Sequence, residues 1–409
     1  MRVRIKKSVF LEIVIMTFLF LAGLNFKNQY YYFLMISVVL VIFERKNIKV
    51  DGNFIALCIL AAAMLIFSPM TKNKITSMIK PFLYPMAYCA GLSFCEEDYE
   101  SVETTVNEKR LLRVIIILSL APFTHYILNW INNLNFAMGR NTIDIWTGSI
   151  ASATIQAAMA CMMVGVVGCV IFADYPIRVK IYAMLMIAAI LAYNMVLAGR
   201  MLIVLIFLIG ACSFLFSFSM QKEKSKKQKT IATVIVIMLV VHIIYSGNFF
   251  GIRERIEESN LYARFFGNYA MGITEDGRGA AKLAYLQNFP KSLWGGCQIR
   301  QMGIGYAHDI FLDTYDEGGL LALLGIAVFV IGSVKTWLGI LKNDIYCMRL
   351  KQMLFSVYLA IYVVFALEPV LQGAPWLFSL FCFIHGMTVR LGYEKNKRIE
   401  ANENKRSFC

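Results

Sequence analysis

The chain has 409 residues, of which 59% are hydrophobic and only 16% are charged, whereas soluble domains average about 25% charged residues. This composition excludes a soluble globular protein and indicates an integral membrane protein with room for on the order of a dozen helical spans. The net charge of +14 does not indicate nucleic acid as a partner, because basic residues of polytopic membrane proteins gather in cytoplasmic loops.

Apolar runs predict twelve membrane-spanning helices, and therefore an all-α polytopic bundle that we expect to form a single membrane domain over residues 1–409. The first run follows a basic start, as in a signal peptide, but a second run follows almost at once and favours an uncleaved span. The short loops richest in Lys and Arg lie on the side of both termini, so the positive-inside rule predicts cytoplasmic termini. The runs cover residues 9–24, 30–43, 54–70, 78–94, 111–131, 148–173, 181–197, 201–219, 230–245, 318–337, 354–367 and 376–391.

One long polar interval, residues 247–317, separates the ninth and tenth predicted spans and faces outward in this topology. Its length of roughly 70 residues far exceeds a typical connection, so the segment is expected to be functional or disordered. Its many aromatic residues argue against disorder. Within it, Ala281 and Tyr285 stand at helical spacing, which predicts an amphipathic surface helix that ends before Pro290.

His308 is one of only four histidines and lies in this loop, just before the tenth predicted span. A lone histidine is more often structural than catalytic, but an unperturbed imidazole titrates near 6.5 and can accept a proton from a hydroxyl at neutral pH. Four carboxylates follow it, and they would orient the imidazole, bind sugar hydroxyls or solvate the helix end: Asp309, Asp313, Asp316 and Glu317.

Two arginines are candidates for binding an anion. Arg200 lies between two apolar runs at the expected outer boundary, where it would either reach lipid phosphates or hold an anionic substrate with its forked donors. Arg278 lies at the start of the predicted surface helix, whose free N–H groups would reinforce anion binding; its alternative is a surface pair with Glu275 or Asp276. Arg300 is a weaker candidate of the same kind.

Carboxylates at membrane depth are functional candidates by default. Glu12 and Glu368 are of this type, and Glu368 is the stronger because it falls at the outer end of the eleventh predicted span. The sequence contains no D-x-D, HExxH or P-loop motif and no Cys/His cluster at metal-ligand spacing, so it predicts neither a metal nor a nucleotide cofactor.

These features together resemble the O-antigen polymerase and O-antigen ligase family of bacteria. The resemblance rests on the topology of about twelve spans, on Arg200 after small residues at an outer boundary, and on Arg278 followed by a helix and the turn at 290–296. It also rests on a final segment with Gly303, Gly305, His308 and residues 317–319. Asp309 stands where that family usually has asparagine.

The resemblance implies a glycosyltransferase that uses neither a metal nor a nucleotide sugar. Its donor and acceptor would be glycans linked to polyisoprenyl pyrophosphate, on the outer face of the bacterial cytoplasmic membrane, and its product would be O-antigen, capsule or another surface polysaccharide. Arg200 and Arg278 would then stabilise the departing pyrophosphate, and His308 would activate the acceptor hydroxyl. The expected substrate-binding residues are Arg300, Asp309, Asp313, Glu317 and Glu368.

Three functions remain open on the sequence. A polymerase joins repeat units, and it is favoured because nothing indicates a dedicated second acceptor; a ligase would transfer the chain to a different acceptor. A twelve-helix transporter or lipid-linked glycan flippase shares the topology, but the related halves and matching interrupted helices typical of transporters are not evident in the sequence. The expected partners are the lipid bilayer and the flippase and chain-length regulator of the same pathway.

Overall fold

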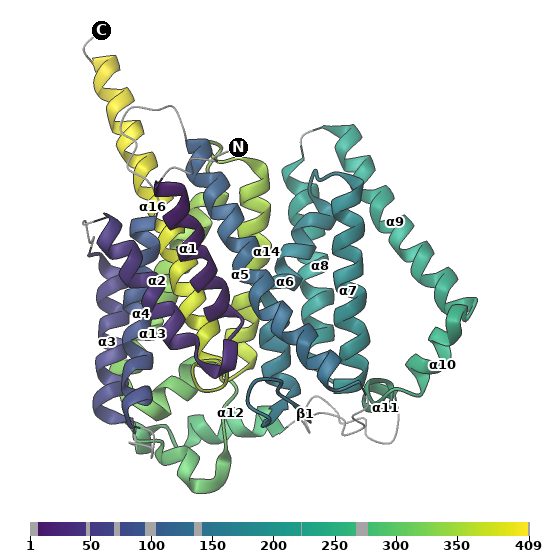
Figure 1. Cartoon of the computed structure of the whole chain (residues 1–409), viewed down its shortest axis with the longest axis horizontal. Helices are drawn as coiled ribbons and strands as arrows, with labels where there is room; N and C mark the ends of the chain where they lie inside the picture. The colour runs from purple at the N-terminus through teal and green to yellow at the C-terminus, as the bar shows by residue number, and fades with distance from the viewer. Residues whose placement is uncertain are drawn as a thin grey trace. The chain divides into compact units, whose positions relative to one another are not determined.

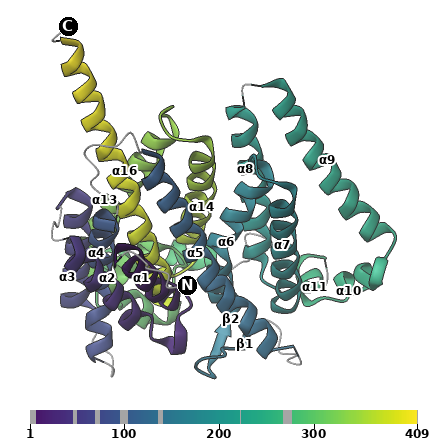
Figure 2. The ribbon, with the colours of Figure 1, turned by 45° about the horizontal axis from the view of Figure 1, so that its top comes forward.

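The computed structural model describes residues 7–45, 50–68, 74–94, 104–134, 141–221, 223–266 and 277–407, most of which are helical (Figures 1 and 2). Contacts divide the chain into two compact units. The first comprises Met1–Pro122, Ala281–Cys347 and Glu368–Cys409, and the second Phe123–Ala280 and Met348–Leu367.

The first unit is built on two pairs of helices that lie side by side: α3 with α13, and α4 with α16 (Figure 1). In the second pair a Cβ on Gly91 would overlap the carbonyl of Phe383, and a Cβ on Gly386 would overlap that of Tyr88. Small residues at these points let the two backbones approach closely, as in membrane helix pairs. The helices of this unit are α1 (Lys7–Gly23), η1 (Phe26–Asn28), α2 (Tyr30–Arg45), α3 (Gly52–Phe67), α4 (Lys74–Phe94), η4 (Phe289–Ser292), η5 (Arg300–Ile304), α13 (Ile310–Leu341), α15 (Val370–Gly373) and α16 (Pro375–Ser407), with most of α5 (Thr104–Asn132) and of α12 (Gly277–Gln287).

The second unit is arranged around α6 (Ala153–Phe172), which is buried over almost its whole length because α7, α8 and α14 pack around it. Its other elements are α7 (Ile177–Leu197), α8 (Arg200–Met220), α9 (Lys224–Ser246), η2 (Phe249–Gly251), α10 (Ile252–Glu257), α11 (Asn260–Phe266), α14 (Met348–Leu367) and the hairpin β1 (Asn141–Ile143) and β2 (Ile150–Ser152).

Seven helices of the described residues are long and apolar enough to cross a membrane, and three shorter apolar helices accompany them. On α9 large apolar side chains are exposed in succession, among them Ile235, Met238 and Val241; such a surface is stable in lipid and not in water. The protein is therefore a helical, membrane-embedded protein. Each of the twelve predicted apolar runs overlaps a helix, while the count of twelve crossings stays a prediction. The long spans are Val106–Asn132, Ala153–Phe172, Ile177–Leu197, Arg200–Met220, Lys227–Ser246, Ile310–Leu341 and Met348–Leu367.

The expected helix at residues 148–173 begins later than predicted, because its first residues form the β1–β2 hairpin. The carboxylate of Asp144 holds this hairpin: its Oδ1 accepts the N–H groups of Trp146 and Thr147, each at 3.0 Å, and His125 Nε2 lies 2.7 Å from Oδ2. Burial alone would raise the pKa of Asp144, but the His125 contact and the N–H groups hold it at about 2. Hydrogen bonds to a polar side chain thus stabilise a hairpin where the apolar pattern predicted the start of a helix.

The predicted loop 247–317 is largely folded. It contains η2, α10, α11, α12 and the first turns of α13, while residues 267–276 lie outside the described residues. α13 begins at Ile310 because Asp309 caps it, its Oδ1 accepting the N–H groups of Phe311 (3.0 Å) and Leu312 (3.3 Å). The loop therefore ends at Asp309, earlier than the expected boundary.

Candidate functional site

The polar segment 289–309 is fixed to α13 by the fully buried side chain of Asp316. Its Oδ1 accepts a hydrogen bond from Ser292 Oγ (2.6 Å) and from the backbone N–H of Ile299 (2.9 Å), and its Oδ2 accepts the N–H of Arg300 (3.2 Å). A carboxylate with these bonds is stable without water, because buried charges need such partners. Asp316 is therefore a structural residue that shapes the loop.

Asp313 has the same role at the preceding turn of the helix and is also fully buried. Its two oxygens accept the N–H groups of Ala307 (2.8 Å) and Asp309 (3.0 Å), the neighbours on either side of His308. His308 itself has a φ of 56°, a left-handed conformation that costs free energy unless the surroundings fix it. The prediction that Asp313 binds substrate stays a prediction; in the structure its oxygens accept hydrogen bonds from the backbone that holds His308.

A break in α13 completes this attachment. At Gly319 the backbone has φ 72° and ψ −164°, a conformation open essentially to glycine alone. The break frees the carbonyl groups of Asp316 and Glu317, which accept the N–H groups of Cys297 (2.7 Å) and Gly296 (3.1 Å). Loop and helix are thereby joined by backbone hydrogen bonds as well as by side chains.

The predicted surface helix is present as α12, and its apolar face is buried as the spacing indicated: Ala281 and Tyr285 are its buried residues. Tyr285 donates a hydrogen bond to the carbonyl of Gly305 (2.7 Å), and Phe289 stacks on Tyr315 with ring centroids 4.0 Å apart. Burial also raises the pKa of Tyr285, so its hydroxyl remains a neutral donor. These aromatic contacts pack α12 and the loop against the start of α13.

Cys297 lies inside this packing and is only 7% exposed. Burial raises the pKa of its thiol to about 12, and the thiolate is the reactive form of cysteine. We therefore expect a maleimide reagent at neutral pH to leave Cys297 unmodified in the folded, detergent-solubilised protein while it modifies the exposed Cys347. Mass spectrometry of tryptic peptides measures both; rapid modification of Cys297 would contradict the observed packing.

The side chains of His308 and Glu368, both predicted functional residues, lie beside each other in the structure. Nδ1 of His308 lies 3.5 Å from Oε2 of Glu368, and the imidazole side chain is 27% exposed while the carboxylate is 3% exposed. Glu368 is far away in the sequence, immediately before α15. The imidazole is therefore partly open to an incoming group, whereas the carboxylate is enclosed by the protein.

Glu317 forms hydrogen bonds with two segments of the chain that are far apart in sequence. Its two oxygens accept hydrogen bonds from Ser68 Oγ (3.0 Å), after α3, and from Gln372 Nε2 (2.7 Å), in α15. Because α15 begins two residues after Glu368, the bond to Gln372 helps to fix the chain that carries the Glu368 carboxylate. Glu317 was predicted to bind substrate, and its observed contacts are with the protein.

Arg300 and Lys282 are two of the cations in the same unit. The Arg300 guanidinium stacks over the ring of Tyr306 at 4.4 Å, and its Nε is 3.8 Å from Asp316 Oδ2. Lys282 Nζ is 3.2 Å from Oδ2 of Asp309, so Asp309 is both a helix cap and an ion-pair partner. Sequence reasoning missed Lys282, although its spacing one turn after Arg278 on the predicted helix was a usable signal.

Arg200 and Arg278 belong to the second unit, whereas His308 belongs to the first, so their meeting at one site stays a prediction. Arg200 is the first residue of α8 and follows a turn that is held by a hydrogen bond from Asn194 Nδ2 to the carbonyl of Gly199 (3.1 Å). Arg278 is partly buried in the first turn of α12. Its expected neighbours 275 and 276 lie outside the described residues.

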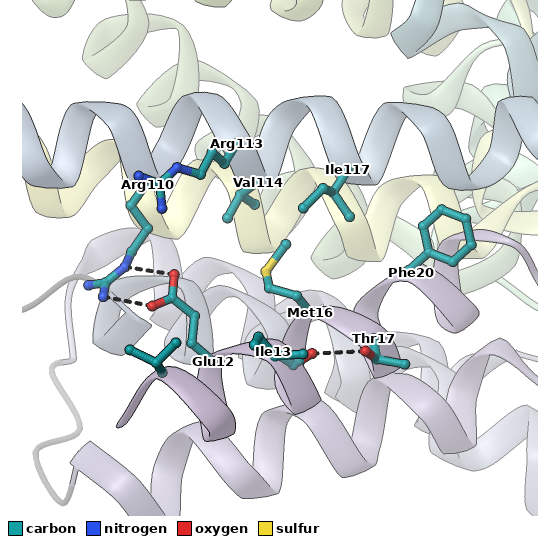
Figure 3. A pocket seen from close by; sticks show the side chains of 10 residues that line it. Glu12, Ile13, Met16, Thr17, Phe20, Arg110, Arg113, Val114 and Ile117 are labelled. Atoms are coloured by element: carbon teal, nitrogen blue, oxygen red, sulfur yellow. Dashed lines mark hydrogen bonds and ion pairs between the residues drawn. The ribbon is translucent and has the colours of Figure 1, made fainter. Parts of the chain in front are cut away.

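Glu12 has a structural partner. Figure 3 shows it in a groove of about 520 Å³ between α1 and α5, where its two oxygens lie 3.3 and 3.1 Å from Nε and Nη2 of Arg110. The rest of the wall is mainly apolar, including Met16, Phe20 and Ile117. The carboxylate of Glu12 and the guanidinium of Arg110 form an ion pair, and Arg113 is a second cation that lines the groove.

The described residues contain no group of three or more His, Cys, Asp or Glu side chains placed to hold a metal ion. The site in the first unit contains an imidazole, a buried carboxylate and the cations Arg300 and Lys282. No model of a known protein family and no curated protein matches this chain.

Proposed function

We propose that this protein is a membrane glycosyltransferase that polymerises oligosaccharide repeat units linked to a polyisoprenyl pyrophosphate. The observation that carries the proposal is the contact between His308 and Glu368, in which a partly exposed imidazole lies 3.5 Å from a buried carboxylate. An imidazole backed by a carboxylate is the usual arrangement for removing a proton from a hydroxyl. The resemblance in sequence to the O-antigen polymerase and ligase family supports the same reaction.

In the proposed reaction, a hydroxyl oxygen of the acceptor sugar attacks the anomeric carbon of the donor. A new carbon–oxygen bond forms there, and the bond from that carbon to the pyrophosphate oxygen breaks, with its electron pair leaving on the pyrophosphate. His308 takes the proton from the attacking hydroxyl, and Glu368 stabilises the resulting imidazolium. Proton transfer to a positioned base typically accelerates such reactions by about 10² to 10⁴.

The hydrogen bonds of the neighbouring carboxylates support the proposal that His308 is the base. The oxygens of Asp313 and Asp316 accept backbone and side-chain hydrogen bonds of the loop, and Asp309 caps α13. None of these three side chains is then required to bind the proton of the acceptor. In our proposal their role is to hold the loop so that the imidazole faces the substrate.

The negative charge that develops on the leaving pyrophosphate needs cations. Arg300 and Lys282 supply positive charge in the unit of His308, and we propose Arg200 and Arg278 as further ligands of the pyrophosphate, on the strength of the sequence resemblance. Removing a single donor from such a site typically costs about 3 kcal/mol in the transition state.

We further propose that the protein resides in the bacterial cytoplasmic membrane with both termini in the cytoplasm, and that the reaction takes place at the outer face. The apolar helices support the membrane location, and the distribution of Lys and Arg between the short loops supports the orientation. The donor and acceptor are then lipids of the same bilayer, delivered by a flippase.

The decisive experiment incubates the purified protein in lipid vesicles with a lipid-linked repeat unit and resolves the products by gel electrophoresis. A ladder of lipid-linked chains that differ by one repeat unit is the expected result. Transfer only to an added second acceptor would indicate a ligase, and passage of the intact lipid across the vesicle without chain growth would indicate a flippase. Either outcome would overturn the proposed polymerase activity.

A further inference from the structure

A second groove, of about 710 Å³, lies in the first unit between α3, α13 and α16. It is lined at its polar end by Asp51, Asn53, Lys335, Asn343 and Tyr393, residues that the proposed transferase reaction does not use. By the distribution of Lys and Arg, this end of the helices is the one that we expect to face the cytoplasm.

The contacts of three glycines give the register of α13 along α3. A Cβ on Gly318 would lie 3.4 Å from Met64 N, and a Cβ on Gly325 would lie 2.8 Å from Leu60 N. At Gly332 the added atom would overlap the side chain of Asn53. The helices thus run antiparallel, and one further turn of α13 brings Lys335 to the level of Asp51, which precedes α3.

Asp51 is a fixed anion in this groove. Its Oδ2 accepts hydrogen bonds from the hydroxyls of Tyr88 (2.6 Å) and Tyr393 (3.2 Å), and its Oδ1 caps α3 by accepting the N–H of Phe54 (2.9 Å). Lys335 is exposed and makes no ion pair with Asp51 among the described residues. Two opposite charges therefore line one groove at the same level without neutralising each other.

The groove continues along an apolar surface. Val328 and Ile331, on the preceding turns of α13, also line it and are 51% and 68% exposed. Near the charged end, a Cβ on Gly339 would meet no atom within 4 Å, which leaves the space beside the helix open. A ligand that fits must therefore carry both a positive and a negative charge at one end and an apolar chain at the other.

We propose that this groove binds an aminophospholipid of the phosphatidylethanolamine type. Its ammonium group would lie at Asp51, its phosphate at Lys335, and an acyl chain along Val328 and Ile331. A membrane-embedded protein meets such lipids in the bilayer, and basic pockets between membrane helices are known to take lipid head groups. The carboxylate distinguishes this groove from a site for anionic lipids, because it would repel their extra charge.

The test measures lipid retention by native mass spectrometry of the full-length protein, released from nanodiscs that contain equal amounts of the palmitoyl-oleoyl forms of phosphatidylethanolamine, phosphatidylcholine and phosphatidylglycerol. We expect preferential retention of phosphatidylethanolamine. Asp51→Asn and Lys335→Gln should each reduce that preference about fivefold, the size expected for one interfacial charge contact. Asn is as good a helix cap as Asp, so the first variant removes the charge and keeps the cap.

Lys342→Gln is the matched control, because Lys342 is also exposed near the end of α13 but does not line the groove; it should retain the wild-type preference. Asp51→Ser, which keeps a capping hydroxyl, repeats the test if the asparagine variant is unstable. Equal retention of phosphatidylethanolamine and phosphatidylcholine by the wild type would overturn the proposal, as would an effect of Lys342→Gln equal to that of Lys335→Gln. A preference for phosphatidylglycerol that does not depend on Asp51 would also overturn it.

Discussion

Replacing His308 with asparagine is expected to reduce the rate of chain growth by a factor of about 10² to 10⁴, the usual contribution of a positioned general base. Asparagine is the appropriate variant because the backbone at this position has a φ of 56°, and asparagine tolerates the left-handed region better than alanine. The amide cannot take up the proton of the acceptor hydroxyl. The measurement is the initial rate of repeat-unit addition by purified protein in vesicles.

The control for this variant is His242→Ala, since His242 is exposed on α9 and its bonded neighbour is Ser246 on the same helix. We expect that variant to retain the wild-type rate. If His308→Asn extended chains at the wild-type rate, the assignment of His308 as the base would be wrong, provided that both variants reach the same abundance in the membrane.

A second variant tests Glu368, which in our proposal acts through His308. Glu368→Gln keeps the shape of the side chain and removes its charge, so the imidazolium loses its counter-charge at 3.5 Å. We expect kcat to fall while KM for the acceptor changes little, and Glu368→Asp to recover some of the rate. Glu258→Gln, at an exposed position before α11, should have no effect. A rise in KM alone would instead assign Glu368 to substrate binding.

Replacing Gly319 with alanine is expected to detach the segment 289–309 from α13. The added Cβ would lie 2.6 Å from the carbonyl oxygen of Leu293 and 2.8 Å from the carbonyl carbon of Trp294, at a φ of 72°. Strained backbone of this kind costs about 1 to 3 kcal/mol, and overpacking adds a similar amount. We therefore expect a lower melting temperature and loss of chain growth.

Modification of Cys297 by maleimide reports this detachment directly, because its N–H bonds to the carbonyl of Asp316 just before the break. We expect rapid modification in Gly319→Ala. Gly339→Ala is the matched control in the same helix, since its Cβ would meet no atom within 4 Å; alanine there should be neutral or stabilise by up to about 1 kcal/mol. Protection of Cys297 in Gly319→Ala equal to the wild type would contradict the proposed role of the break.

The sequence alone was sufficient to predict the helices of this protein, because each apolar run that forms a helix is a local feature of the chain. A run of apolar residues must form hydrogen bonds within itself when it lies in lipid, so each predicted run overlaps a helix. The same local reasoning found α12, whose buried face is given by the spacing of Ala281 and Tyr285. It was wrong at residues 148–152, where the hydrogen bonds of Asp144 stabilise a hairpin in place of a helix.

The contacts of the carboxylates could be seen only in the tertiary structure. From spacing alone, Asp313 and Glu317 were as good substrate ligands as Glu368, since all three are acidic residues near a predicted span. The fold places backbone N–H groups against Asp313 and other side chains against Glu317, and it brings Glu368 beside His308 from a distant region of the chain. Hydrogen-bond partners far apart in sequence are set by how helices pack, and no local pattern encodes them.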